Sequence, residues 1–275
     1  PEFLREGSAV YDFMHPDRVI LGYESEKALA VIKEVYRVLY LNETPFVETT
    51  LESAEMIKYA SNAFLALKVS YINQIADLCE ATGANVIDVA KAMGRDGRIG
   101  SKFLHPGPGY GGSCFPKDTR AFAAAGREFG SPMTIVEDVI AFNKRHIQRM
   151  SEKVASALGG LDGKTVGVLG LAFKPNTEDM RESPALYILR DLAASGALLR
   201  AFDPAAMREA KEKYLKDVPG ITYFTNEYEA LSGADALLIL TEWNQFRNLD
   251  LTRIKNEMNG DFFFDFRNIY SRTYV

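Results

Sequence analysis

Cysteine is scarce in this sequence, which contains only Cys79 and Cys114 among 275 residues. Two cysteines in a chain of this length do not form a disulfide framework, and the low count is typical of a reducing compartment. We therefore expect a cytoplasmic protein in which one of the two thiols can be reactive. We assign no metal site to the chain.

Long apolar runs and an excess of basic residues are also missing. No stretch approaches the ~20 consecutive apolar residues that a helix needs to span a bilayer, and no signal peptide is visible. The 32 Lys and Arg residues are scattered and are outnumbered by 37 Asp and Glu residues, which gives a formal net charge of −5. Nucleic-acid binding requires a concentrated basic face. We therefore expect neither a membrane nor nucleic acid as a partner.

The sequence does contain enough apolar residues, 47%, for about two domains with cores of their own. Its first part, residues 1–51, reads as a short α/β stretch. Strands are predicted at 18–22 and 45–50, and apolar residues three and four apart between Ser25 and Leu39 predict a helix. Two strands are too few for an independent sheet. We interpret this part as the end of a larger α/β domain whose beginning is absent from the sequence.

The central part, residues 52–159, is predicted to be helical apart from a glycine-rich loop at 95–113. Residues 52–82 keep helical periodicity without Pro or Gly, and Gly83 stands where a C-terminal cap is expected. A helix of this length measures ~45 Å, which exceeds the width of a small domain. We therefore expect it to connect domains and to pair with a second copy in a homodimer.

The last part, residues 160–275, follows a glycine cluster that marks a break. Apolar strand segments are predicted at 165–170, 198–202, 236–240 and 262–264, with helices between them. Strands that alternate with helices favour a mostly parallel sheet covered on both faces. We therefore predict an α/β protein in which the helical dimerisation domain is followed by a Rossmann-like domain.

Cys114 lies between the glycine-rich run 107–112 and a helix predicted to begin at about Pro116. Glycines allow backbone N–H groups to approach a ligand closely, and the positive end of a helix favours the thiolate nucleophile. Lys117 adds a cation, and Asp118 is placed to orient or deprotonate water. The alternative is that Cys114 is a small buried apolar residue, which is the usual role of a free cysteine.

Two pairs of polar residues have a spacing of four. Lys58 and Asn62 share one face of the long helix, where they form either a functional pair or an ordinary solvated stripe. Glu2 and Glu6 suit acid–base chemistry, but they equally suit a solvated helix start.

Two cations follow predicted strands of the last part. Lys174 ends the run Gly170-Leu171-Ala172-Phe173-Lys174, and Arg267 follows the strand at 262–264. Open α/β sheets bind ligands at the carboxyl ends of their strands, so two cations there suit a pyrophosphate. The run 167–174 lacks the G-x-G-x-x-G spacing of a dinucleotide loop. The alternative is that both are ordinary surface charges on connecting loops.

Four motifs together resemble the nucleotide-sugar dehydrogenases, the UDP-glucose/GDP-mannose dehydrogenase family. They occur in the family's order and are spread over almost the whole chain: Pro1–Gly7, Glu55–Phe64, Gly109–Asp118, and Gly170–Pro175 with Met180–Ser183. The segment Arg98–Leu104 resembles the UDP-glucose branch of the family rather than the GDP-mannose branch.

The resemblance implies a four-electron oxidation of UDP-glucose to UDP-glucuronate with two NAD+. The C6 alcohol becomes an aldehyde, Cys114 binds the aldehyde as a thiohemiacetal, and a second oxidation gives a thioester that water hydrolyses. Lys58 and Asn62 match the family's oxyanion-stabilising and water-holding pair. Glu2, Glu6 and Asp118 match its acid–base and water-activating carboxylates.

The resemblance also implies binding residues for substrate and cofactor. Arg98 resembles an arginine that reaches the substrate of the neighbouring subunit. Glu6, Lys117 and Arg181 match positions that line the nicotinamide cofactor. The remaining matches to UDP-sugar contacts are Glu2, Phe3, Leu4, Arg5, Glu6, Lys58, Phe103, Leu104, His105, Pro106, Gly107, Gly111, Lys174 and Arg267.

The family's N-terminal Rossmann domain, with its glycine-rich pyrophosphate loop and ribose-binding acid, is the part of the pattern that this sequence does not show. We therefore expect this chain to be inactive alone. Three other interpretations stay open: a UDP-sugar-binding dimerisation module without turnover, a dehydrogenase for a related UDP-sugar such as UDP-N-acetylmannosamine, and a cysteine acyltransferase or hydrolase. The last requires a histidine base, and His105 is the nearest histidine in the sequence.

Overall fold

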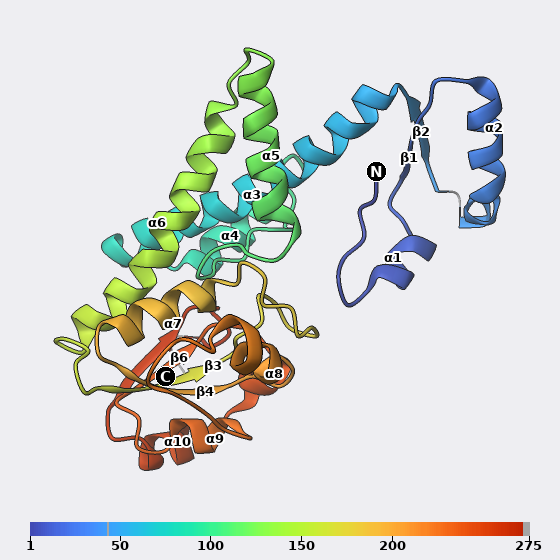
Figure 1. Ribbon diagram of the computed structural model, residues 1–275. Coiled ribbons are helices and arrows are strands. Elements are labelled where there is room, and N and C mark those ends of the chain that lie inside the picture. Colours follow the sequence, from blue (N-terminus) through green and yellow to red (C-terminus); the bar gives the residue numbers. More distant parts are fainter. Residues whose placement is uncertain (43, 272–275) are drawn as a thin grey trace. The chain divides into compact units, whose positions relative to one another are not determined.

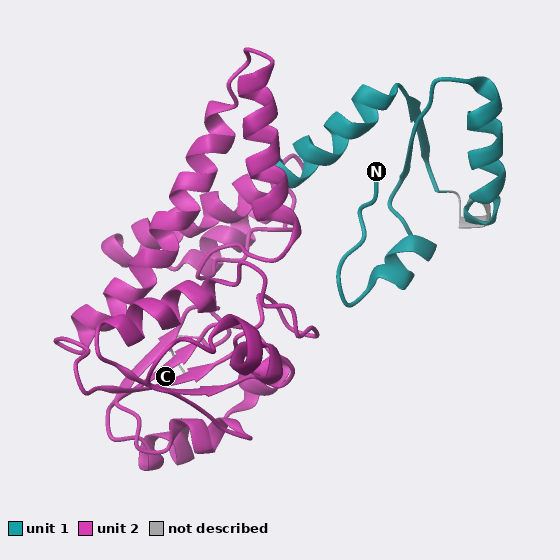
Figure 2. Cartoon of the chain, viewed as in Figure 1, with its two compact units in different colours: residues 1–64 teal, residues 65–275 magenta. Residues whose placement is uncertain are grey.

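The computed structural model of the chain describes residues 1–42 and 44–271 (Figure 1). By its internal contacts the chain divides into two compact units, residues 1–64 and the residues from 65 onward (Figure 2). Within the described residues, no helix is both long and apolar enough to cross a membrane.

The first unit contains a small β–α–β arrangement. Strands β1 (Val19–Gly22) and β2 (Phe46–Thr49) pair in parallel, and helix α2 (Glu26–Val35) connects them. Ser25 caps α2 by accepting a hydrogen bond from the Ala28 N–H at 3.2 Å. The predicted strands and helix are confirmed, except that α2 ends at Val35 and the 3-10 helix η1 (Arg37–Asn42) follows it. A one-turn helix, α1 (Ala9–Met14), precedes β1.

The long helix predicted at 52–82 is confirmed as α3 (Leu51–Thr82). Gly83 ends it with a φ of +77°, a conformation that suits glycine because it has no Cβ. The next helix, α4 (Val86–Gly94), begins where the Asn85 side chain accepts a hydrogen bond from the Ile87 N–H at 3.0 Å.

Two antiparallel helices follow the glycine-rich loop. Helix α5 (Cys114–Glu128) begins two residues earlier than predicted, at Cys114 rather than Pro116. Proline is tolerated in the first turn of a helix because its missing N–H has no partner there, so Pro116 does not mark the exact start. Helix α6 (Thr134–Ala157) returns along α5, and the helical character of this region is confirmed.

The predicted parallel sheet is confirmed. Its order is β5 (Ile221–Tyr223), β4 (Leu198–Phe202), β3 (Thr165–Leu169), β6 (Ala236–Ile239) and β7 (Phe262–Asp265), with every pairing parallel. Strand β5 was not predicted because its sequence, Ile-Thr-Tyr, contains no continuous apolar run like the three phenylalanines at 262–264. From the central strand β3 the chain adds β4 and β5 toward one side of the sheet, and then β6 and β7 toward the other. The sheet is therefore doubly wound, and the carboxyl ends of its strands all lie at one edge.

Each face of the sheet has its own apolar core. Val166 and Val168 of β3 pack with helices α6 and α7 (Pro184–Ala194), whereas Leu169 packs with α9 (Glu227–Leu231) and α10 (Leu251–Glu257). Figure 1 shows α7 on one face and α9 and α10 on the other. The short elements α8 (Met207–Glu209), η2 (Ala210–Tyr214) and η3 (Asn244–Asn248) complete the unit.

Candidate functional site

The glycine-rich loop is attached to two helices through buried side chains. Asn143 of α6 accepts a hydrogen bond from the Tyr110 N–H at 2.9 Å and donates one to the Tyr110 carbonyl at 3.0 Å. Asn73 of α3 accepts from the Gly107 N–H at 2.8 Å, and His146 of α6 lies 2.9 Å from the Gly107 carbonyl. Because side chains that are themselves buried fix both peptides, the loop has a defined path.

The end of this loop passes so close to another segment that only glycine fits. A Cβ on Gly111 would lie 2.3 Å from the carbonyl oxygen of Glu182. Gly112 has a φ of +80°, a Cβ there would lie 2.7 Å from the Phe173 ring, and its N–H donates to the Arg181 carbonyl at 2.8 Å. The segment before α7 therefore contacts the loop immediately before Cys114.

Cys114 is the first residue of α5, so it lies at the positive end of the helix macrodipole. Its side chain is half-buried, and its sulfur lies 3.7 Å from the hydroxyl of Ser113. Asp118 is four residues along the same helix and therefore on the same face. The side chain of Asp118 is only 1% exposed and forms an ion pair with Lys117, whose side chain is mostly exposed.

The strand-end cation Arg267 contacts both the sheet and the loop. Its side chain is 12% exposed, forms an ion pair with Glu242 at 3.1 Å, and donates to the carbonyls of Leu240 at 2.7 Å and Phe173 at 3.1 Å. A Cβ on Gly107 would lie 3.2 Å from one guanidinium nitrogen of Arg267. The structure thus brings the predicted UDP-sugar loop to the predicted strand-end cation.

Further contacts join the same two segments. The His105 ring lies 2.7 Å from the Arg267 carbonyl, and Asn268 donates to the Pro106 carbonyl at 3.4 Å. Leu104 is buried, whereas Phe103 is 37% exposed. Lys174, after β3, lies with its ammonium 5.3 Å from the centre of the Phe173 ring, next to the carbonyl that Arg267 contacts.

Asp203 organises the turn that precedes Lys174. It follows β4, is fully buried, and accepts hydrogen bonds through one oxygen from the Leu171 N–H at 2.6 Å, the Ala172 N–H at 3.0 Å and the Trp243 indole at 3.1 Å. Its other oxygen accepts from the Ala205 and Ala206 N–H groups, both at 2.8 Å. In a dinucleotide site an acid near this position would bind a ribose. Asp203 has a structural role instead.

Left-handed backbone conformations occur beside these residues. The non-glycine residues of the described chain with positive φ are Phe103 (65°), Asn176 (63°), Glu182 (52°) and Asn268 (51°). Each is itself a predicted site residue or lies within two residues of one. Such conformations are costly and concentrate at functional sites. The positions of these four residues therefore support a functional site at the predicted residues, independently of the motifs.

Several predicted residues lie together in the first unit. Lys58 forms an ion pair with Glu2 at 3.4 Å and lies 5.2 Å from the centre of the Phe3 ring. Glu2 also accepts from the Leu4 N–H at 2.7 Å. The alternative that Glu2 and Glu6 form a helix start is wrong, because Glu2 is in an extended segment and Glu6 in a turn before α1. Asn62 is buried on α3.

Three predicted arginines form ion pairs with nearby aspartates. Arg5 pairs with Asp12 at 2.5 Å, and this hydrogen bond lowers the pKa of Asp12 well below its usual range. Arg98 pairs with Asp96 at 2.6 Å, although its side chain is 90% exposed. Arg181 pairs with Asp179 at 2.9 Å and is half-exposed.

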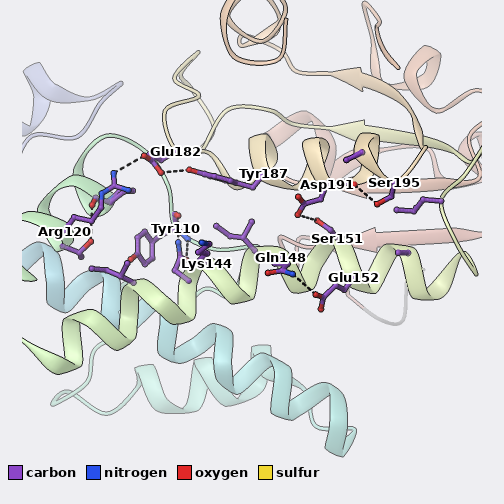
Figure 3. A pocket seen from close by; sticks show the side chains of 18 residues that line it. Tyr110, Arg120, Lys144, Gln148, Ser151, Glu152, Glu182, Tyr187, Asp191 and Ser195 are labelled. Carbon is purple, nitrogen blue, oxygen red and sulfur yellow. Dashed lines mark hydrogen bonds and ion pairs between the residues drawn. The ribbon is translucent and has the colours of Figure 1, made fainter. Parts of the chain in front are cut away.

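A groove of about 830 Å³ runs along α6 between α5 and α7 (Figure 3). Tyr110 and Arg120 lie at one end of it (Figure 3), and Pro116 and Arg120 belong to α5, so the groove lies against the helix that Cys114 begins. None of the predicted site residues lines the groove. At this end Glu182 accepts from Arg120 at 3.0 Å and from the Tyr187 hydroxyl at 2.7 Å (Figure 3).

The Glu182–Tyr187 pair predicts a pH dependence. Burial and the hydrogen bond to Glu182 raise the pKa of Tyr187 to about 12. Because this value exceeds the usual one of about 10, the pair stabilises the fold below about pH 10, and this contribution is lost as the pH rises toward 12. We expect Tyr187→Phe to remove the component with a midpoint near pH 12 from an ultraviolet titration of the tyrosines. An unchanged titration curve would contradict the assignment.

The described residues contain only part of what a dinucleotide needs. The turn between β1 and α2 contains no glycine, and a Cβ on Gly22, the last residue of β1, would lie 2.7 Å from Ala54, so no glycine-rich pyrophosphate loop is formed there. Of the predicted cofactor-lining residues, Glu6 is exposed, and Lys117 and Arg181 are exposed cations. No group of three or more His, Cys, Asp or Glu residues in 1–42 and 44–271 is placed to hold a metal ion.

The residues that fix the loop were missed in the sequence. Asn73, Asn143 and His146 lie on the buried faces of α3 and α6, and no motif distinguishes them. A polar residue on an otherwise apolar helix face is the one available signal, because a buried polar group requires a hydrogen-bonding partner.

Comparison with known families gives three matches. Residues 52–145 match the central domain of the UDP-glucose/GDP-mannose dehydrogenase family, residues 167–272 match its UDP binding domain, and residues 1–40 match its NAD binding domain.

Individual relatives agree with these matches. A UDP-glucose 6-dehydrogenase of Rhizobium meliloti (strain 1021) is 50% identical over 278 residues, which cover 100% of this chain and 63% of the relative. The structure of a UDP-glucose dehydrogenase from Pyrobaculum islandicum is similar with a TM-score of 0.88 and 37% identity, and covers 97% of this chain and 62% of its own. A UDP-D-ManNAc dehydrogenase from Pyrococcus horikoshii has a TM-score of 0.82 at 24% identity over 99% of this chain and 61% of its own, which shows a likeness of fold alone.

Proposed function

The chain belongs to the UDP-glucose/GDP-mannose dehydrogenase family, and on this basis we propose that it takes part in the NAD-dependent oxidation of UDP-glucose to UDP-glucuronate. It spans 63% and 62% of the length of the two UDP-glucose dehydrogenases compared above. The proposed activity is therefore that of an enzyme with the relatives' full length that contains this chain. We propose that this chain supplies three parts of that enzyme. Residues 1–51 are the end of the cofactor domain, residues 52–159 the central domain, and residues 160–275 the UDP-sugar-binding domain.

One observation carries this proposal. The glycine-rich loop contacts Arg267 at Gly107 and ends at Cys114, the first residue of a helix. A phosphate-binding cation and a nucleophile are thereby attached to the two ends of one loop. This arrangement suits a substrate whose phosphates are held away from the carbon that reacts.

Cys114 is proposed to react covalently with the substrate. NAD+ supplies the hydride acceptor for both two-electron oxidations. The sulfur adds to the aldehyde carbon, a C–S bond forms and the carbonyl oxygen takes up a proton, which gives a thiohemiacetal. After the second oxidation has produced a thioester, water breaks the C–S bond and releases the carboxylate and the thiol. Asp118, on the same face of α5, is proposed to activate this water.

The remaining roles follow the resemblance. Lys58 is proposed to stabilise the oxyanion, Asn62 to hold water, and Glu2 and Glu6 to act in acid–base steps. Glu6, Lys117 and Arg181 are proposed to line the cofactor. The proposed UDP-sugar contacts are Glu2, Phe3, Leu4, Arg5, Glu6, Lys58, Arg98, Phe103, Leu104, His105, Pro106, Gly107, Gly111, Lys174 and Arg267.

Binding of UDP tests the strand-end site. We expect Lys174→Ala to weaken UDP binding, since it removes a charge-assisted contact worth roughly 1.5–3 kcal/mol, and Arg267→Lys to weaken it while retaining the charge. Isothermal titration calorimetry with the 275-residue chain measures both, and Lys216→Ala, a change elsewhere in the same domain, is the control. Unchanged affinity in both variants would show that the phosphates bind elsewhere.

Binding of UDP-glucose without NAD+ reduction is the expected behaviour of the chain alone.

We also propose that α3 forms a homodimer. Phe64, Tyr71 and Leu78 are seven residues apart, lie on one face of α3 and are 60%, 48% and 59% exposed. A stripe of this spacing on a helix suits a second copy of the same helix.

The double variant Tyr71→Asp/Leu78→Asp is therefore expected to sediment as a monomer at micromolar concentration, because two buried charges would oppose pairing. Phe129→Asp is the matched control, since Phe129 is 83% exposed but lies at the end of α5. A wild-type chain that is strictly monomeric, or a double variant that still dimerises, would contradict the proposal.

A further inference from the structure

The Tyr110 peptide is bound on both sides by one side chain. Asn143 of α6, which is only 8% exposed, accepts a hydrogen bond from the Tyr110 N–H at 2.9 Å and donates one to the Tyr110 carbonyl at 3.0 Å. A carboxylate can only accept and an ammonium can only donate, whereas a side-chain amide does both. Asparagine therefore matches this peptide in both directions, as a paired residue of a neighbouring strand does in an antiparallel sheet.

The loop lies close enough to α6 for this contact because a glycine precedes Tyr110. Gly109 has a φ of +127°, and a Cβ there would lie 2.7 Å from Ile147 and 3.0 Å from Oδ1 of Asn143. Asn143 and Ile147 are four residues apart, so they share one face of α6. Any side chain at Gly109 would displace the loop from this face, and the glycine and the asparagine are thus required together.

The Tyr110 side chain connects the same peptide to the helix that Cys114 begins. Tyr110 is buried in an apolar cluster with Ala66 of α3 and Val139 of α6, and Phe115 packs against this cluster. The rings of Tyr110 and Phe115 meet edge-on with their centres 6.1 Å apart. Phe115 follows Cys114 in the first turn of α5, so Tyr110 links α6 to the turn that contains the thiol.

The segment between Tyr110 and Cys114 is short and contains two glycines. Glycine populates more backbone conformations than other residues, so contacts from outside must fix this segment. The Arg181 carbonyl fixes it at Gly112, and Asn143 fixes it at Tyr110. The apolar contacts of the tyrosine ring do not set the orientation of the peptide, because they are non-directional.

The other end of the loop is fixed by different side chains. Gly107, which packs against Arg267, donates its N–H to Asn73 of α3, and its carbonyl lies 2.9 Å from the ring of His146. The contact with the strand-end cation and the path to the thiol therefore depend on separate hydrogen bonds.

We propose that Asn143 is a positioning residue for Cys114, which fixes the Tyr110 peptide and, through it, the segment that leads to the nucleophile. This inference rests on the proposed function, because it assumes that Cys114 reacts with the substrate. A nucleophile must lie about 3–3.5 Å from the atom that it attacks, and a displacement of about 1 Å can reduce the rate by about a hundredfold. Asn143 thus contributes to turnover and not to the affinity for the sugar nucleotide.

Hydrogen exchange of the 275-residue chain tests the contact without a ligand. Asn143→Asp keeps an acceptor for the Tyr110 N–H but replaces the donor to the carbonyl with a carboxylate oxygen. We expect the backbone amides between Gly109 and Phe115 to exchange about tenfold faster, because one hydrogen bond is lost, and those of Phe103–Gly107 to exchange as in the wild type. A general loss of stability would instead accelerate exchange throughout the chain.

Asn259→Asp is the matched control. Asn259 also donates its side-chain amide to a backbone carbonyl, that of Gly233 at 3.0 Å, but it is exposed in the segment before β7. This variant should leave exchange in the glycine-rich loop unchanged. Unchanged exchange between Gly109 and Phe115 in folded Asn143→Asp would overturn the proposal.

Steady-state kinetics of an enzyme of the relatives' full length test the consequence for turnover. We expect Asn143→Asp to lower kcat for UDP-glucose oxidation by about tenfold or more. The affinity for UDP-glucose, measured by calorimetry, should stay within about twofold of the wild-type value, since Gly107 and Arg267 keep their contacts. Asn259→Asp should match the wild type in both measurements.

The outcomes separate the two levels of inference. If the wild-type enzyme forms no UDP-glucuronate, the proposed function fails, and hydrogen exchange alone decides whether Asn143 fixes the segment before Cys114. If the wild type is active and Asn143→Asp keeps its kcat, or loses affinity for UDP-glucose instead, the positioning role is wrong. If Asn143→Asp does not fold, Asn143→Ala, which adds no charge, is measured in its place against the same expectations.

Discussion

Cys114→Ser is expected to abolish formation of UDP-glucuronate in an enzyme of the relatives' full length, by on the order of a thousandfold or more. A serine hydroxyl is far less acidic than a thiol, so the nucleophilic alkoxide is scarce at neutral pH. An ester is also hydrolysed less readily than a thioester. Steady-state product formation measures the loss, and calorimetry should show UDP-glucose binding nearly unchanged, because the thiol is proposed to react with the carbon that is oxidised and not to contact the nucleotide.

Cys79 is the internal control for this prediction. It is buried in α3 against Val86 and Leu104, so Cys79→Ser should reduce stability and leave turnover largely intact. A thiol reagent should label half-buried Cys114 faster than Cys79, and UDP-glucose should slow that labelling. Normal turnover by Cys114→Ser, or preferential and ligand-protected labelling of Cys79, would exclude the covalent mechanism.

Of the substitutions proposed for this chain, Asp203→Ala is expected to cause the largest decrease in the free energy of unfolding. The substitution leaves five donors without their acceptor, among them the N–H groups of Leu171 and Ala172 at the end of β3. A buried donor without a partner costs about 1–3 kcal/mol, so we expect a decrease in the free energy of unfolding of about 4 kcal/mol or more. Urea unfolding measures it.

Asp250→Ala is the matched control for Asp203→Ala. Asp250 is exposed and accepts one hydrogen bond, from the Arg253 N–H at 3.0 Å, at the start of α10. Loss of such a cap costs about 1 kcal/mol. Equal losses in the two variants would show that the hydrogen bonds of Asp203 do not stabilise the fold more than one exposed cap does. UDP binding should also weaken in Asp203→Ala, because Lys174 follows the turn that Asp203 fixes.

The elements of this fold could be predicted where local pattern decides them. The length of α3 follows from 31 uninterrupted residues and Gly83, and β3, β4, β6 and β7 follow from mainly apolar segments of three to six residues. The start of α5 was placed two residues too late, since proline is accepted anywhere in a first turn. Strand β5 was missed because its pairing with β4, and not its own sequence, makes it a strand.

The candidate site could be predicted only in its motifs. Cys114, Lys174 and Arg267 lie in recognisable segments, but the contact between Arg267 and Gly107 joins residues that only the fold brings together. The side chains that fix the loop, Asn143 and His146, look like ordinary polar residues of an amphipathic helix. Their function lies in which backbone group each one meets, and a single sequence does not contain that information.

The contacts of the glycine-rich loop also set an order for folding. The His105 ring meets the Arg267 carbonyl across 162 positions of the chain, and Gly107 meets Asn73 across 34. Contacts between distant residues require large loops to close, and this entropic cost is recovered only once both partners are in place. The helical hairpin of α5 and α6 and the strands up to β7 must therefore be largely formed before the loop acquires its final path. A ribosome must complete β7 and Arg267 before this loop can form its contact with the sheet.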